Sequence, residues 1–161
     1  MQKQKGFSLI ELLIVVAIIL IIAAIAIPNL LRARIAANEA SAVASIRTIN
    51  TAMISYDSSY PTIGFAAALS NLGGTCTGST VPTTAAGCLI DSTLAAGTKS
   101  GYTFKAATSG SAPAGAYYAY ANPLTSNSTG VRSFCSIQDA VVRVAGTSAV
   151  STCAGTETPL Q

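Results

Sequence analysis

The sequence contains no histidine and no tryptophan, and only 9% of its 161 residues carry a charge. Without histidine there is no Ser–His or Cys–His catalytic pair, and no imidazole is available to bind a metal ion. The remaining residues suggest no cofactor either. Asp139 with Ser133 or Ser136 supplies no base of near-neutral pKa, so the sequence argues against an anchored enzyme.

Positive charge is also sparse. Nine lysines and arginines stand against six acids, and Lys3 and Lys5 precede a long apolar run at residues 7–27. Without those two lysines, the excess of cations falls from three to one. Because a protein that tracks phosphates needs a concentrated basic surface, nucleic acid is not expected as the main partner.

Four cysteines lie beyond the apolar run and none belongs to a CxxC pair; they are Cys76, Cys88, Cys135 and Cys153. This spacing does not support a zinc or redox site. An even number of cysteines in a small domain instead indicates two disulfides and an oxidising compartment. Three pairings are possible. Proximity along the chain favours Cys76–Cys88 and Cys135–Cys153, and four free buried thiols are the alternative.

In the apolar run, only Ser8 and Glu11 are polar. About 20 such residues in a helix span the roughly 30 Å hydrocarbon core of a bilayer, so the run predicts a membrane helix. The basic hexapeptide MQKQKG precedes it, and no small-residue cleavage pattern follows it. We therefore expect the run to stay in the mature chain, with the cysteine-bearing part outside the membrane.

The stretch KGFSLIELLIVVAIILIIAAIAIP, residues 5–28, resembles the N-terminus of type IV pilin precursors. Those proteins carry a short basic leader that ends in glycine, then phenylalanine, then glutamate four residues later. The resemblance extends to about residue 60. It implies cleavage between Gly6 and Phe7 by an inner-membrane prepilin peptidase, followed by methylation of the new amine of Phe7.

The resemblance also gives a reason for Glu11, the one acid in the apolar run. A carboxylate facing lipid is costly and usually has a partner. Cleavage would create a cationic amine at Phe7. Pairing between the amine of one subunit and Glu11 of its neighbour would fix their relative height, which is the registry use of a buried ion pair. The alternative is a glutamate that extends to the head-group region and has no role in assembly.

The helix is expected to continue past Pro28, which removes one backbone hydrogen bond and predicts a kink. Residues 29–60 are rich in alanine and other helix formers. Their apolar positions recur on one face, at Ile35, Ala42, Ile46, Ile49, Met53, Tyr56 and Tyr60. The first half of the helix needs lipid or other subunits to cover it, unless it is a lone anchor on an alanine-rich stalk.

The rest of the chain has the composition of a small head domain, with many Gly, Ser, Thr and Ala residues. We expect a short helix over residues 65–72 that is ended by Gly73, and then a disulfide-stapled loop over residues 73–101. Strands are expected to start near Tyr102, Ala116, Val131 and Ala140.

A sheet of three or four antiparallel strands would cover the apolar face of the helix. The predicted fold class is therefore α+β, with a long N-terminal helix on a small antiparallel sheet, which is the pilin fold by resemblance. The expected divisions are a leader at 1–6, a transmembrane or filament-core half of the helix at 7–28, an amphipathic half at 29–60 and the head at 61–161.

The predicted function is that of a structural subunit that polymerises into a helical surface filament. By resemblance, its partners are copies of itself, the prepilin peptidase and methyltransferase, and an ATPase-driven assembly platform. The precursor would lie in the bacterial inner membrane, and the filament outside the cell. Motility, adhesion, DNA uptake and secretion are not distinguished.

The alternatives are a minor pilin, or a pseudopilin of a type II secretion system, which forms a periplasmic filament. Major pseudopilins carry a calcium site near the C-terminus. After Pro61 the acids are Asp91, Asp139 and Glu157, which are too scattered to predict such a site.

Overall fold

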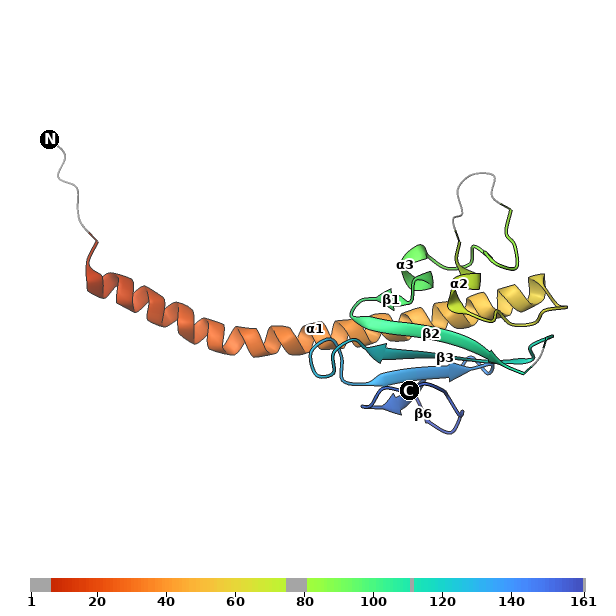
Figure 1. Ribbon diagram of the computed structural model, residues 1–161. Coiled ribbons are helices and arrows are strands. Elements are labelled where there is room, and N and C mark those ends of the chain that lie inside the picture. Colours follow the sequence, from red (N-terminus) through yellow and green to blue (C-terminus); the bar gives the residue numbers. More distant parts are fainter. Residues whose placement is uncertain (1–6, 75–80, 111, 161) are drawn as a thin grey trace. The chain divides into compact units, whose positions relative to one another are not determined.

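The computed structural model describes residues 7–74, 81–110 and 112–160. The chain divides into two compact units, Met1–Arg34 and Ile35–Gln161. It has the predicted α+β architecture, a long N-terminal helix followed by an antiparallel sheet (Figure 1). The elements are α1 (Leu9–Ser59), α2 (Leu69–Leu72), α3 (Ser92–Ala95), β1 (Thr98–Lys99), β2 (Tyr102–Ser109), β3 (Ala116–Pro123), β4 (Ser133–Ile137), β5 (Arg143–Gly146) and β6 (Thr158–Pro159).

Helix α1 begins directly after Ser8, whose carbonyl accepts the first helical hydrogen bond from the N–H of Leu12 at 3.2 Å. Its ends lie within two residues of the predicted 7–60, and Pro61 prevents the helix from continuing. The helix passes through Pro28 without ending. Membrane helices tolerate proline in this way because neighbouring groups can satisfy the freed carbonyl. The kink at Pro28 stays a prediction.

The six strands form a meander in which every neighbouring pair is antiparallel, in the order β1-β2-β3-β4-β5-β6. Strands β2 and β3 are the longest and pair over their full eight residues, from Tyr102 opposite Pro123 to Ser109 opposite Ala116. In Figure 1 these strands run beside the C-terminal half of α1. Because consecutive strands are antiparallel neighbours, the chain needs no crossover connection.

The core lies between the sheet and the predicted apolar face of α1. Five positions of that face are buried, and Ile35 and Tyr60 at its ends are half-buried. The sheet contributes the large side chains of Tyr102, Tyr117 and Phe134. The buried positions of the predicted face are Ala42, Ile46, Ile49, Met53 and Tyr56. The periodicity of the sequence therefore identified the buried face of this helix.

The short elements differ from the prediction. The helix expected at 65–72 is reduced to α2, because the N–H of Phe65 donates to Ala114 and Ala68 bridges Ala107, so this stretch pairs as extended chain. Gly73 follows α2 with a negative φ of −87° and not in the left-handed conformation of a glycine cap. The two-residue strands β1 and β6 were not predicted, since two residues show no periodicity.

The expected loop at 73–101 contains α3, whose start also has a local cause. The carboxylate of Asp91 accepts a hydrogen bond from the N–H of Leu94 at 2.9 Å, which is the N-cap interaction that acids favour. Cys76 lies outside the described residues, so the Cys76–Cys88 pairing stays a prediction.

Candidate functional site

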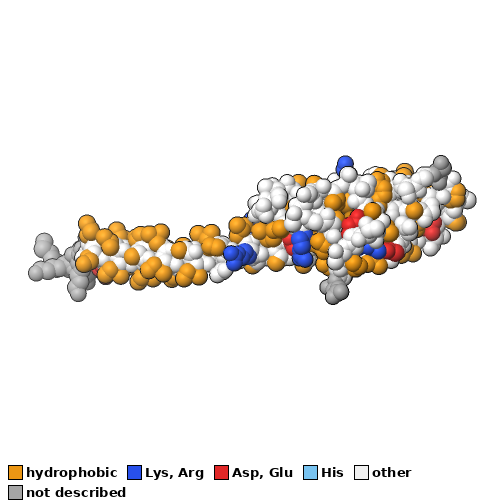
Figure 2. Space-filling model, turned by 90° about the horizontal axis from the view of Figure 1, so that it is seen from below, with side chains coloured by type: hydrophobic (Ala, Val, Ile, Leu, Met, Phe, Trp, Pro, Cys, Tyr) orange, Lys and Arg blue, Asp and Glu red, His pale blue; other side chains and the backbone are white. Residues whose placement is uncertain are grey.

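The N-terminal stretch of α1 presents apolar side chains that nothing in its own unit covers. Phe7 is 75% exposed, and the large aliphatic side chains between Leu9 and Leu31 are exposed as well. Figure 2 shows hydrophobic side chains over the surface of this stretch. By length and composition it is a helix that could cross a membrane. A surface of this kind needs lipid or protein around it, because soluble monomers rarely expose a continuous apolar surface over a whole helical stretch.

Glu11 lies in the first turn of this stretch and is exposed. Its N–H donates to the carbonyl of Ser8 at 3.1 Å, which places it at the third helical position. Among residues 7–34, neither a hydrogen bond nor an ion pair engages its carboxylate. An acid here interacts favourably with the positive end of the helix dipole. Its charge is otherwise available to a cation from outside the helix.

The predicted cleavage and methylation site, Gly6 and Phe7, precedes α1 in the sequence. Gly6 lies outside the described residues, and Phe7 precedes the first helical residue. Residues 7 and 11 are one helical turn apart in spacing, so a new amine at Phe7 could reach Glu11 of its own chain or of another. The roles of Gly6, Phe7 and Glu11 therefore remain proposals.

In the head, Glu39 is the polar interruption of the apolar face of α1, and its side chain is only 9% exposed. The backbone N–H groups of Val131 and Arg132 each donate to its Oε1 at 3.0 Å. The guanidinium of Arg132 donates from Nε to Oε2 at 2.8 Å and forms an ion pair through Nη2 at 2.7 Å. Burial opposes ionisation of this carboxyl, but these donors outweigh it and lower the pKa of Glu39.

The loop that precedes β4 is fixed to α1 and to β2 by further contacts beside Glu39. Asn38 Nδ2 donates to the carbonyl of Thr129 at 2.8 Å, and the Tyr102 hydroxyl donates to the carbonyl of Arg132 at 2.9 Å. A side chain at Gly130 would overlap the Tyr102 ring, so this loop needs glycine to approach the core. Asn38 and Glu39 thus hold a loop that lies 91 to 93 residues later in the chain.

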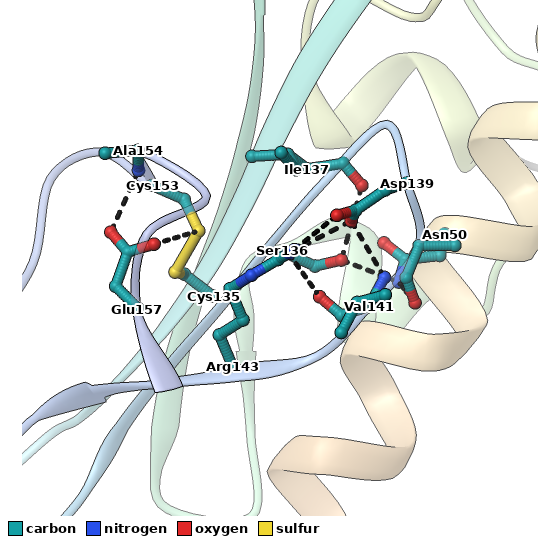
Figure 3. A network of polar contacts seen from close by, with 11 residues as sticks. Asn50, Cys135, Ser136, Ile137, Asp139, Val141, Arg143, Cys153, Ala154 and Glu157 are labelled. Carbon is teal, nitrogen blue, oxygen red and sulfur yellow. Dashed lines mark hydrogen bonds and ion pairs between the residues drawn. A yellow bond between two sulfur atoms is a disulfide. The ribbon is translucent and has the colours of Figure 1, made fainter. Parts of the chain in front are cut away.

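A second buried polar group, Asn50, joins α1 to the end of the sheet (Figure 3). Its Nδ2 donates to Ser136 Oγ at 2.9 Å and to the carbonyl of Ala140 at 3.1 Å. The Tyr117 hydroxyl donates to Asn50 Oδ1 at 3.0 Å. Burial, with a smaller contribution from the charge of Asp139, raises the pKa of Tyr117 to about 12, so the phenol stays a donor. These bonds satisfy an amide that would otherwise destabilise the core.

The C-terminal segment is attached to the outer side of the sheet by a disulfide between Cys135 of β4 and Cys153. This confirms the predicted Cys135–Cys153 pairing. Close by, Arg143 forms an ion pair with Asp139, and its Nη1 also donates to the carbonyl of Val141 at 3.0 Å (Figure 3). Within the described residues, Arg143 Nε is the buried side-chain nitrogen without a hydrogen-bond partner.

The cluster of Cys135, Cys153 and Glu157 has ligand atoms within 4.8 Å of one another but is not a metal centre. Both sulfurs are used in the disulfide. Glu157 accepts a hydrogen bond from the N–H of Ala154 at 2.9 Å. In the part of the chain that the structure describes, the three acids after Pro61 therefore have local structural contacts and do not converge on an oxygen-rich site.

Comparison with known proteins matches the N-terminal segment. The family model of the prokaryotic N-terminal methylation motif covers residues 1–27. Over 39 residues, 24% of this chain and 30% of the relative, the chain is 67% identical to the type IV wide pilus major component PilA4 of Thermus thermophilus. The chain therefore carries the N-terminal methylation motif and is similar, over part of its length, to a type IV pilus component.

Two further relatives also match part of the chain. The identity is 44% over 54 residues with the type IV major pilin protein PilA of Myxococcus xanthus, which is 34% of this chain and 24% of that protein. It is 40% over 65 residues with the type II secretion system core protein G of Vibrio cholerae, which is 38% of this chain and 44% of that protein. The chain thus matches less than half of the length of each relative. No solved structure matches it.

Sequence reasoning found the residues of the apolar segment and one disulfide, but it missed the polar contacts of the head. Glu39 gave a signal, because an acid interrupts an otherwise apolar helix face. Its partner Arg132 gave none, since the two residues are 93 positions apart. Asn50 and Arg143 likewise became recognisable as buried groups only once the sheet had brought their partners together.

Proposed function

We propose that the chain is a structural subunit, not an enzyme, which polymerises into a type IV pilus. One observation carries the proposal: a helix stretch with the N-terminal methylation motif exposes its apolar side chains along its whole length. Lipid would cover this stretch before assembly, and copies of the same stretch would cover it in the filament. The relatives named as pilins support this reading of the motif.

Processing would prepare the chain for assembly. Hydrolysis of the Gly6–Phe7 peptide bond by a prepilin peptidase would release the leader and create an amine at Phe7, which is then N-methylated. The amine stays cationic, because methylation of an amine keeps its charge. In the filament, the amine of one subunit would pair with Glu11 of its neighbour, and the loss of water around both charges would make a mismatch in height costly.

The partners and the location follow from this reading. The precursor would lie in the bacterial inner membrane through residues 7–28, with the head on the outer side, where the Cys135–Cys153 disulfide can form. Copies of the chain, the peptidase and methyltransferase, and an ATPase-driven assembly platform would be its partners. The finished filament would lie outside the cell.

A pseudopilin of a type II secretion system is the second candidate, because the chain is 40% identical over 65 residues to core protein G of Vibrio cholerae. By resemblance, pilins and pseudopilins share the leader and the long helix, so this similarity does not distinguish the two classes. In the described part of the head, Asp91 caps α3, Asp139 pairs with Arg143 and Glu157 binds a backbone N–H. These engaged acids favour the pilin over a calcium-binding pseudopilin.

Mass spectrometry of filaments sheared from intact cells tests the proposal. We expect a chain that begins at N-methyl-Phe7 and whose mass is reduced by the hydrogens lost in two disulfides. A processed chain found only in the membrane and periplasm would favour the pseudopilin. Retention of Met1 to Gly6 on a chain exposed to the peptidase would contradict both candidates.

A further inference from the structure

In the head part of α1, one cation, Arg47, and one acid, Asp57, form no ion pair with another described residue. Among the described head residues, 35–74, 81–110 and 112–160, the ion pairs are Lys99–Asp91, Arg132–Glu39 and Arg143–Asp139. Arg47 and Asp57 of α1 take part in none of them. Arg47 is exposed and Asp57 is half-exposed. Two opposite charges on one helix that form no ion pair within the described part of the chain can pair with the corresponding charges of a second copy.

Arg47 borders a hollow of about 340 Å³ on the head. Its floor is apolar and its other charged residues, Glu39 and Arg132, already pair with each other, so the free charge at the hollow is that of Arg47. The lining residues are Ala36, Glu39, Ala40, Val43, Ala44, Arg47, Arg132 and Leu160. The hollow therefore fits an apolar side chain with an acid beside it.

Ile54 and Asp57 of α1 are such an apolar side chain with an acid beside it. Ile54 is 50% exposed, although it lies on the helix that forms the core of the head. It is three residues before Asp57, so both side chains lie on one face of α1. Neither Ile54 nor Asp57 lines the hollow of its own chain.

The spacing along α1 makes the two surfaces compatible between parallel copies. Asp57 follows Arg47 by ten residues, and Ile54 follows Ala44 by ten residues. If one copy is shifted by about 15 Å along the helix axis, its Asp57 lies at the height of Arg47 of the other copy, and its Ile54 at the height of Ala44. Since the two surfaces differ, the contact is heterologous, and heterologous contacts that do not close produce open helical filaments.

We propose that Ile54 and Asp57 of one subunit occupy the hollow of the next, with Asp57 paired to Arg47 and Ile54 against Ala44. The inference rests on the proposed filament function and adds a contact between heads to the contact at Glu11. Its charges are opposite and complementary, which favours one register over others.

A charge swap in the full-length chain tests this contact. Arg47→Glu alone and Asp57→Lys alone place like charges together, and each should reduce the yield of sheared filaments about tenfold. The double variant Arg47→Glu with Asp57→Lys restores the pair in reversed order and should return the yield to near that of the wild type. Immunoblots of the membrane fraction check that all variants reach equal levels.

Lys105 offers a matched control, because it is exposed on β2 and away from the hollow. Lys105→Glu changes the net charge as Arg47→Glu does, and it should leave the yield unchanged. Lys105→Glu with Asp57→Lys has the same net charge as the swap but should not restore assembly. Recovery in that control would show that net charge, not pairing, decides the yield.

Single variants that assemble like the wild type would overturn the contact. So would single variants that fail without rescue by the swap, which is the outcome expected if a different protein occupied the hollow. Absence of filaments from the wild-type chain would instead contradict the proposed function itself, and would be seen before any variant is compared.

Discussion

Helix α1 has two stretches, residues 9–34 and 35–59, which differ in how far their side chains are buried and paired. Ile19 in the first stretch is 57% exposed, whereas Ile46 in the second is fully buried against the sheet. Glu11 has no partner among residues 7–34, whereas Glu39 accepts from two backbone N–H groups and the guanidinium of Arg132. The side chains of the second stretch are covered and paired by residues of the same chain. The first is left uncovered within its own unit, and the proposed filament would cover it with lipid or with other copies of the chain.

The largest expected effect comes from truncating the same residue type in each stretch. Ile46→Ala removes buried aliphatic atoms and should lower the free energy of unfolding of the head by about 2–5 kcal/mol. Ile19→Ala should leave it unchanged, since its side chain is exposed and belongs to the other unit. Guanidinium unfolding of the full chain in detergent, followed by near-ultraviolet circular dichroism of the tyrosines, measures both. Equal losses would contradict the division between the two stretches.

A somewhat smaller effect is expected for the disulfide of the head. Cys135 and Cys153 are separated by 18 residues, and a closed loop of this size stabilises a fold by about 3 kcal/mol through the entropy of the unfolded chain. The double variant Cys135→Ala with Cys153→Ala should lose about this amount in the same unfolding experiment. Unchanged stability would show that contacts such as Asn122 with Val150 hold the C-terminal segment without the bond.

The smallest effect compares the two glutamates of α1. Glu39→Gln removes the charge that pairs with Arg132 and should cost the head about 2 kcal/mol near neutral pH. Glu11→Gln should leave the stability of the head unchanged. The same unfolding measurement applies, and a neutral Glu39→Gln would show that the amide replaces the carboxylate as an acceptor.

The effect of Glu39 should also depend on pH. The pKa of Glu39 is lowered in the folded state from its usual value of 4.5, so the charged form is favoured by folding. Such a group stabilises above its unfolded pKa, and this contribution is lost as the pH falls through the folded pKa. The difference between the wild type and Glu39→Gln should therefore be constant above about pH 5 and shrink at lower pH. A difference that grows on acidification would contradict the ion pair.

The parts of the fold that repeat locally could be predicted from the sequence. The apolar face from Ala42 to Tyr56 follows helical spacing, and the strands near Tyr102 and Ala116 are rich in aromatic residues between turn residues. Gly73 was misleading because the preceding chain pairs with distant strands and shortens α2. Local helix propensity cannot predict that residues will pair with a distant strand instead of forming a helix.

The polar contacts of the head depend on long-range pairing and could not be predicted. The sequence around Glu39 does not predict Arg132 as its partner. The sequence around Asn50 likewise does not predict Ser136 or Tyr117. Glu11 is the opposite case. Its partner was proposed from the motif around it, and the single chain leaves its carboxylate without one among the described residues. The motif thus predicted a contact that a subunit by itself cannot show.

The most direct test of this difference is to express Glu11→Ala together with the wild-type chain. The N-terminal peptides of the two forms differ in mass, so their ratio can be measured in sheared filaments and in the membrane fraction. If Glu11 is completed by a neighbouring subunit, both forms are cleaved before Phe7, but the variant is about tenfold depleted from filaments relative to the membrane. An equal ratio in filaments and membrane would contradict the account, and Glu11 would then serve only its own helix.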